Sequence, residues 1–124
     1  MAEGYTVKHW DEFEEMEGSG NATWRLARKS LDAESFGFNV VDIAAGGQIP
    51  EHSHADDPEE EVYLTLEGDA TFIADDEEIP APPGTFIRYS PGIQRTIRNH
   101  SDAPVRALVI GVPMDSGYQP MSWG

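Results

Sequence analysis

Between residues 23 and 112 the sequence divides into short runs of β-branched and aromatic residues, each followed by turn residues. Short runs with such boundaries are typical of β-strands, and many of them in succession favour a sandwich or a barrel. The predicted strands are residues 23–29, 36–44, 60–66, 70–74, 85–89, 94–98 and 105–112. Glycine, proline and acidic residues separate them at residues 45–47, 67–69, 75–78, 82–84 and 90–92. The sequence therefore predicts an all-β fold.

The N-terminal segment, residues 9–17, departs from this pattern. Its Trp10, Phe13 and Met16 recur at spacings of three with acidic residues between them, which predicts a short helical turn. With 124 residues the chain is close to the usual size of one domain and is long enough to close one hydrophobic core. We therefore predict a single domain over residues 1–124, with its barrel core at about residues 23–113.

The charge of the chain restricts its partners. Its 23 acidic residues outnumber the 8 basic ones, the formal net charge is −15, and Lys8 and Lys29 are the only lysines. Nucleic-acid binding needs a basic stripe, whereas the arginines here are scattered, so we expect no nucleic-acid partner. The recurring apolar runs argue against disorder. A folded, acidic, lysine-poor surface resembles the surfaces of proteins from salt-loving organisms, where salt screens the self-repulsion, and it predicts a halophilic protein.

Two absences from the sequence narrow the chemistry and the location. The chain has no cysteine, which excludes disulfides, thiolate metal sites and thiol nucleophiles. It has no run of about 18 apolar residues and no basic start followed by an apolar stretch, so we expect neither a membrane partner nor secretion. These observations predict a cytoplasmic protein.

The residues with the clearest chemical signal lie near the middle of the chain. In an extended strand, residues two apart face the same way, so His52 and His54 point to one side together. The next run alternates again and places Glu61 and Tyr63 on one face. If Glu61 faces the histidines, two nitrogens and a carboxylate converge, and this set suits divalent iron, manganese, nickel, copper or zinc. We therefore predict His52, His54 and Glu61 as metal ligands.

This stretch resembles the first motif of the cupin family, which contains a Gly, His-x-His, a Glu and a second Gly. The matching residues are Gly46, His52, His54, Glu61 and Gly68. The spacings before the histidines and after Glu61 fit the motif, whereas the gap between His54 and Glu61 is longer than usual. Glu59 lies closer to the usual distance and shares the strand phase of Glu61. Only Glu61 keeps the motif's distance to Gly68, so we choose Glu61.

The second cupin motif is similar to residues 90–99, in which Gly92 and Asn99 match. The position of the family's last histidine ligand is occupied by Arg95. A guanidinium is cationic and only donates hydrogen bonds, so Arg95 cannot bind a metal ion and repels one placed nearby. The resemblance spans residues 27–113 and is closest to small single-domain cupins of unassigned activity.

Arg95 and Tyr63 are the predicted ligand-binding residues. Arg95 has three interpretations: it clamps the carboxylate of a small molecule, it pairs with Glu61 and neutralises the site, or it is an outward charge. Tyr63 either orients a ligand or fills the barrel with its hydroxyl satisfied. The sequence leaves open whether one divalent metal ion is bound, because the ligand set favours it and the Arg95 cation opposes it.

The resemblance implies a cupin-like double-stranded β-helix, or jelly-roll barrel, which is often dimeric, so we expect a homodimer. The family's chemistry includes dioxygenases, isomerases, decarboxylases and metal-free binding proteins, so the fold does not define the function. Three hypotheses follow. The chain is a small-molecule-binding barrel with a partial metal site, a metal-dependent enzyme of the dioxygenase or isomerase type, or a ligand-free dimeric scaffold.

Overall fold

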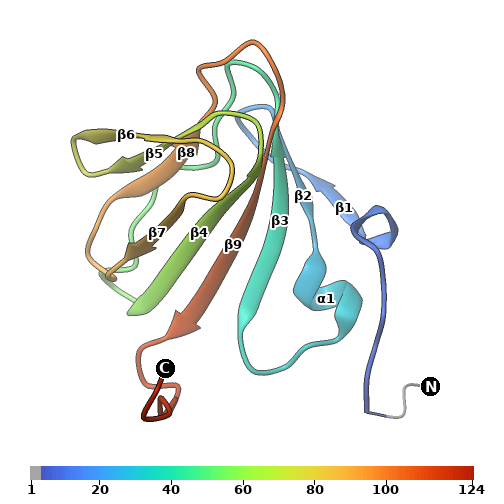
Figure 1. The fold of residues 1–124 in the computed structure, drawn as a ribbon, viewed down its shortest axis with the longest axis vertical. Helices are drawn as coiled ribbons and strands as arrows, with labels where there is room; N and C mark the ends of the chain where they lie inside the picture. Colours follow the sequence, from blue (N-terminus) through green and yellow to red (C-terminus); the bar gives the residue numbers. More distant parts are fainter. Residues whose placement is uncertain (1–3) are drawn as a thin grey trace.

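The computed structural model describes residues 4–124 and consists mainly of antiparallel β-strands (Figure 1). The strands are β1 (Glu15–Glu17), β2 (Ala22–Arg25), β3 (Gly37–Ile43), β4 (Glu59–Glu67), β5 (Ala70–Ala74), β6 (Glu77–Ala81), β7 (Phe86–Tyr89), β8 (Arg95–Arg98) and β9 (Val105–Pro113). The helices are the 3₁₀ helix η1 (Trp10–Glu12) and the helix α1 (Ala27–Leu31).

Two sheets form the walls of the barrel. The large sheet has the strand order β1-β2-β3-β9-β4-β7, and the small sheet has the order β6-β5-β8. Residues 48–52 extend the small sheet along β8 through bridges between Gln48 and Arg98 and between His52 and Arg95. The segment that carries the first motif therefore lies directly beside the strand that carries the second.

The core lies between the sheets. Its inward-facing residues are mainly apolar along most of the barrel and include polar residues and glycines near the start of β4. The large buried side chains are Val41, Ile43, Ile49, Tyr63, Phe72, Tyr89, Ile97 and Val105. Across β4, β9 and β3, one row of register partners joins Tyr63, Val109 and Asn39. The next row toward the start of β4 joins Glu61 to two glycines, Gly111 and Gly37. The inward face is thus apolar in the core and becomes polar and less crowded where Glu61 lies beside two glycines. The antiparallel strands confirm the predicted all-β fold.

The structure corrects two of the predicted N-terminal elements. The strand predicted at residues 23–29 ends at Arg25, and α1 begins at Ala27. Ala, Arg, Lys and Leu are good helix formers, and the Asn39 side chain accepts a hydrogen bond from the Ala27 amide at 3.1 Å. The helical turn predicted at residues 9–17 is limited to η1, because the following residues form β1 against β2.

A third correction concerns residues 75–78, which were expected to be a break between strands. They contain a tight turn and the start of β6, and β5 pairs with β6 from Ala74 opposite Glu77. Asp75 takes the left-handed conformation (φ 52°), which aspartate tolerates better than most residues. β6 is an edge strand, and its exposed Glu77 and Glu78 protect that edge from pairing with other chains.

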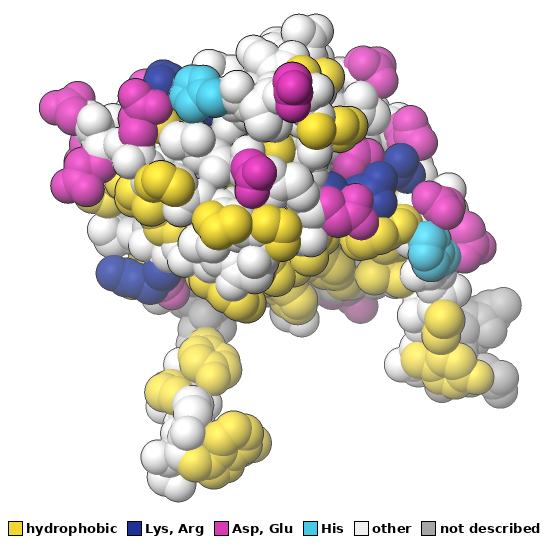
Figure 2. Space-filling view, turned by 45° about the horizontal axis from the view of Figure 1, so that its top comes forward, with side chains coloured by type: hydrophobic (Ala, Val, Ile, Leu, Met, Phe, Trp, Pro, Cys, Tyr) yellow, Lys and Arg dark blue, Asp and Glu magenta, His cyan; other side chains and the backbone are white. Residues whose placement is uncertain are grey.

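Carboxylates are scattered over the face shown in Figure 2, between apolar and other side chains, and both ends of the described chain extend away from the barrel. The exposed apolar side chains of the C-terminal end are Met114, Tyr118, Met121 and Trp123, and those of the N-terminal end are Tyr5 and Val7. Among residues 4–124, no helix has the length and apolar character needed to cross a membrane.

A charged cluster holds η1 against the outer face of the large sheet. The Asp42 carboxylate accepts hydrogen bonds from Arg25 Nε at 2.8 Å and from Arg106 Nε at 2.6 Å. Arg25 also donates to the carbonyl oxygen of Trp10 at 3.2 Å, and the Arg106 guanidinium lies 4.4 Å from the Trp10 ring centroid. Burial raises the pKa of Asp42, but the hydrogen bonds and charges of Arg106 and Arg25 outweigh it and lower that pKa.

The substitution Asp42→Asn is expected to lower the free energy of unfolding by about 1–2 kcal/mol at neutral pH, because two arginines lose their shared carboxylate. Since the folded-state pKa of Asp42 is lowered, its contribution is present above about pH 4 and is lost as the pH falls through the lowered pKa. Urea denaturation of the unaltered protein and of the Asp42→Asn variant between pH 7 and pH 3 measures this pH dependence. A stability difference that does not shrink below pH 4 would contradict the assignment.

Candidate metal centre

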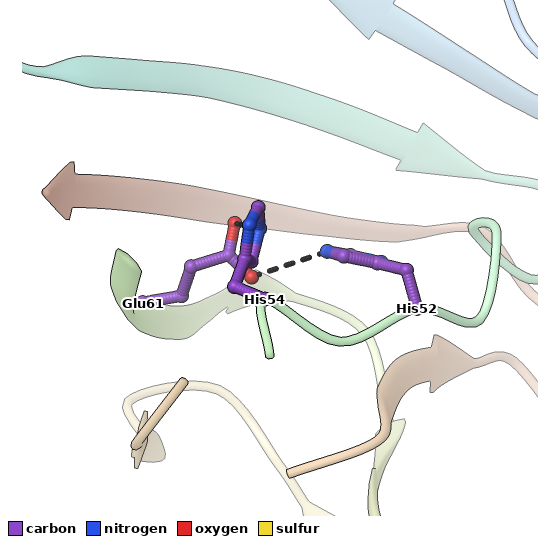
Figure 3. A group of neighbouring side chains, drawn as sticks. All are labelled: His52, His54 and Glu61. Atoms are coloured by element: carbon purple, nitrogen blue, oxygen red, sulfur yellow. Dashed lines mark ion pairs between the residues drawn. The ribbon is translucent and has the colours of Figure 1, made fainter. Parts of the chain in front are cut away.

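The two motif histidines are placed by backbone pairing with β8 and the turn before it. His52 and Arg95 exchange two backbone hydrogen bonds, of 3.0 and 2.8 Å, and the His54 amide donates to the carbonyl oxygen of Pro91 at 2.8 Å. The two imidazole rings lie 5.1 Å apart, nearly perpendicular to each other. Both rings face the same inward-pointing residue of β4, Glu61 (Figure 3).

Glu61 lies between the histidines and presents one oxygen to each. Its Oε1 is 3.3 Å from His52 Nε2, and its Oε2 is 3.5 Å from His54 Nε2 (Figure 3). The side chain has space at this position because its register partner on β9 is Gly111. A Cβ atom at Gly111 would lie 2.9 Å from Glu59 Oε1 and 3.5 Å from Glu61 Oε2, so a side chain there would crowd both carboxylates.

In each histidine, Nδ1 is the ring nitrogen that does not face Glu61, and it lies close to a hydrogen-bond acceptor. His52 Nδ1 is 3.0 Å from the carbonyl oxygen of Pro50, and His54 Nδ1 is 3.1 Å from Asp57 Oδ1. An acceptor at Nδ1 favours the tautomer with its proton there, which leaves the lone pair of each neutral ring on Nε2, the atom that faces Glu61. Metal-binding histidines in proteins are oriented in the same way.

Glu61 is itself held by two buried donors. The Tyr63 hydroxyl donates to Oε1 at 3.0 Å, and Arg95 Nη1 donates to the same oxygen at 3.2 Å. The Arg95 side chain is fully buried, and its remaining hydrogen bonds go to the carbonyl oxygens of Ser90, Pro91 and Ile93. The guanidinium therefore joins the turn before β8 to the carboxylate on β4.

These contacts shift the ionisation of the site. Burial raises the pKa of Glu61, but the hydrogen bonds donated by protonated His52 and by Tyr63, together with the charges of the protonated histidines, outweigh it and lower that pKa. The hydrogen bond to Glu61 raises the pKa of His52, against the opposing effect of burial. Burial, together with the negative charge of Glu61, raises the pKa of Tyr63, so its hydroxyl stays protonated and remains a donor. The cluster thus keeps an ionised carboxylate at its centre.

The spacing of these atoms suits one metal ion. Ligand atoms at about 2.1 Å from one ion lie about 3.0–3.4 Å apart in octahedral or tetrahedral geometry. The two histidine–carboxylate distances are 3.3 and 3.5 Å, and one ligand atom from each of His52, His54 and Glu61 lies within 4.8 Å of the others. Glu59 forms a separate group with His54 and Asp57 that does not include His52.

The structure brings together all five site residues predicted from the sequence. The cluster contains His52, His54, Glu61, Tyr63 and Arg95. Arg95 makes the predicted ion pair with Glu61, whereas ligand binding by Arg95 and Tyr63 stays a prediction. Sequence reasoning missed Asn39 and Val109, which form the cavity wall together with Trp24. These residues come from three different strands and share no motif, although each faces inward.

The fold and the site together describe a β-barrel protein that carries a His-His-Glu cluster between its two sheets. The comparison with protein families identifies it: residues 39–111 match the model Cupin_2, described as a cupin domain, so the chain belongs to the cupin family. Cupins often bind metal ions, and this chain contains a group of residues that could hold one. A comparison with curated proteins finds no match.

Solved structures with different described activities share the fold. A sugar phosphate isomerase of the cupin superfamily from Silicibacter pomeroyi has a TM-score of 0.76 and 20% identity, over 88% of this chain and 76% of its own. A predicted oxalate decarboxylase from Thermotoga maritima has a TM-score of 0.75 and 16% identity, over 88% and 100%. The polyketide cyclase RemF from Streptomyces resistomycificus has a TM-score of 0.71 and 20% identity, over 86% and 78%. At these identities the likeness shows the fold alone.

The substitution Arg95→Met is expected to lower the free energy of unfolding by about 3–5 kcal/mol, because it leaves buried carbonyl oxygens and the Glu61 carboxylate without their donor. The matched control is Arg98→Met on the same strand, where Arg98 forms a more exposed pair with Glu51 at 3.3 Å. That variant is expected to change stability by about 0–1 kcal/mol. Urea denaturation measures both, and equal losses would show that Arg95 has no special structural role.

Proposed function

We propose that this cupin binds a small molecule at a divalent metal ion held by His52, His54 and Glu61. The observation that supports the proposal is the orientation of the two imidazoles. Each Nδ1 faces an acceptor, on Pro50 or on Asp57, so each neutral ring directs its Nε2 lone pair toward the carboxylate. Acceptor atoms that face one another repel unless a cation lies between them, and a divalent metal ion fits this position.

The ligand set is compatible with several metals and with catalysis. Imidazole nitrogens and a carboxylate suit iron, manganese, nickel, copper or zinc, and a metal ion held by three residues keeps positions for a substrate, as a dioxygenase or an isomerase needs. Glu61 Oε1, which faces His52, already accepts from Arg95 and Tyr63, so Oε2, which faces His54, is the oxygen with free lone pairs for a metal. In this proposal Arg95 acts through Glu61, by fixing the direction of its carboxylate.

A second candidate is a metal-free binding protein. It is favoured by the Arg95–Glu61 ion pair and by the raised pKa of His52, because a proton on His52 also satisfies the facing carboxylate. A carboxylate ligand would then compete with Glu61 for the Arg95 guanidinium. The two candidates differ in one measurable property, the metal content of the protein.

Elemental analysis is expected to find about one equivalent of iron, manganese, nickel, copper or zinc in protein purified without chelator in high salt. The variants His52→Ala and His54→Ala are expected to lose most of it, because each removes one of three ligands. The matched control is His100→Ala, since His100 is exposed, pairs with Glu78 and lies outside the cluster. It should retain the metal content of the unaltered protein.

One result would contradict the metal proposal. Protein that folds, contains no metal and takes up none on dialysis against these ions would exclude the metal proposal and favour the metal-free candidate. Circular dichroism of each variant separates the loss of a ligand from the loss of the fold.

We also propose that the protein is a homodimer. The exposed apolar side chains of the C-terminal end support this, because Tyr118, Met121 and Trp123 gain little stability unless they are covered. Light scattering is expected to give about twice the chain mass of 13.7 kDa. A mass that stays at the monomer value across micromolar concentrations would contradict the dimer.

A further inference from the structure

A cavity of about 240 Å³ adjoins the candidate metal centre inside the barrel. His52 and Glu61 form its polar end. The rest of its wall combines the large sheet, through Trp24, Asn39, Tyr63 and Val109, with the segment beside β8, through Ile49 and Pro50. A ligand that reaches a metal ion at the centre would place the remainder of its atoms in this cavity.

The wall opposite the polar end is mainly apolar. Trp24, Ile49, Pro50 and Val109 supply hydrocarbon or indole surface, and the Tyr63 hydroxyl is already committed to Glu61. Asn39 is the one uncharged polar side chain there apart from Tyr63. Its Oδ1 accepts from the Ala27 amide at 3.1 Å, which leaves the Nδ2 group as the donor for a ligand.

No lysine or arginine is among the residues that line the cavity. Arg95 is the nearest guanidinium of the centre, but it is fully buried and bound to three carbonyl oxygens and to Glu61. Arg98, on the same strand, is paired with Glu51. A phosphate or a remote carboxylate against this apolar wall would therefore give up part of its hydration without gaining a cationic partner, which is unfavourable.

We propose that the cavity selects a small ligand that binds the metal ion through oxygen and whose remainder is uncharged and apolar. The inference rests on the proposed metal site and names the ligand class of that site. A second hollow of about 150 Å³ shares Asn39, Glu61 and Val109 with this cavity, and a six-membered ring is a suitable first probe for the apolar wall.

The test compares two probes with the same metal-binding group. Catechol is a six-membered ring with two neighbouring hydroxyl groups, and 3,4-dihydroxybenzoate adds one remote carboxylate. Each is titrated under argon into protein loaded with Co²⁺, with the visible spectrum of the metal as the readout. We expect catechol to bind at least about tenfold more tightly than 3,4-dihydroxybenzoate, a difference of about 1.4 kcal/mol.

Two variants of one wall residue test the cause of this preference. Val109→Lys places a cation in the cavity, and Val109→Met adds a side chain of similar length without charge. The lysine variant is expected to lose or reverse the preference, because the remote carboxylate gains a partner. The methionine variant is expected to weaken the binding of both probes and to keep the ratio of their affinities, because it only fills space. The Co²⁺ content of each variant verifies that the centre is intact.

The outcomes separate this inference from the proposal on which it rests. Equal or tighter binding of 3,4-dihydroxybenzoate by the Co²⁺-loaded protein would overturn the ligand class while leaving the metal site in place. Protein that takes up no Co²⁺ would overturn the metal site. In that case the change in melting temperature with each probe measures binding to the cavity without a metal. A rise in melting temperature with catechol and none with 3,4-dihydroxybenzoate would support the ligand class. The reverse would overturn it.

Discussion

The buried ion pair between Arg95 and Glu61 is the interaction on which the rest of the site depends. A guanidinium removed from water is tolerated only when its donors are satisfied, and Arg95 meets this condition through the turn before β8 and through the carboxylate on β4. The same contacts couple the two sheets, because β8 belongs to the small sheet and β4 to the large one. The direction of the Glu61 carboxylate is thus fixed by the packing of the barrel, and the histidines meet a carboxylate that is already oriented.

Arginine at this position changes what the cluster can do. A histidine there would add a ligand, whereas the arginine takes one oxygen of Glu61 and leaves three residues for an ion. Its positive charge also offsets the carboxylate, so the cluster can persist with a proton where a metal would otherwise be needed. Metal binding and the metal-free state are therefore close alternatives in this cupin, and the orientation of the imidazoles favours the metal.

The sequence predicted what depends on local periodicity and missed what depends on pairing across the chain. Alternation along β4 placed Glu61 and Tyr63 on one inward face, and most strand positions followed from turn residues. The α1 helix was missed because a five-residue helix is too short for a periodic signal, and β6 was missed because an exposed edge strand can be acidic. The motif spacing placed Arg95 at the position of an inward ligand, whereas its full burial depends on carbonyl oxygens of the turn before β8, which the spacing does not encode.

Related barrels can have different ligands because backbone pairing sets the inward positions, while the side chains at these positions differ. The sheet registers bring Asn39, Tyr63 and Val109 into one row, next to the row of Glu61, Gly111 and Gly37, and backbone pairing alone sets these rows. Any cupin with these registers offers the same inward positions, so the side chains at those positions decide which molecule fits. In this chain the rows hold two glycines, an amide, a valine, a tyrosine and the carboxylate of Glu61, and most other acidic residues lie on the outer surface. The surface charge governs solubility and encounter, while a cavity that is mainly apolar away from its His52 and Glu61 end governs recognition.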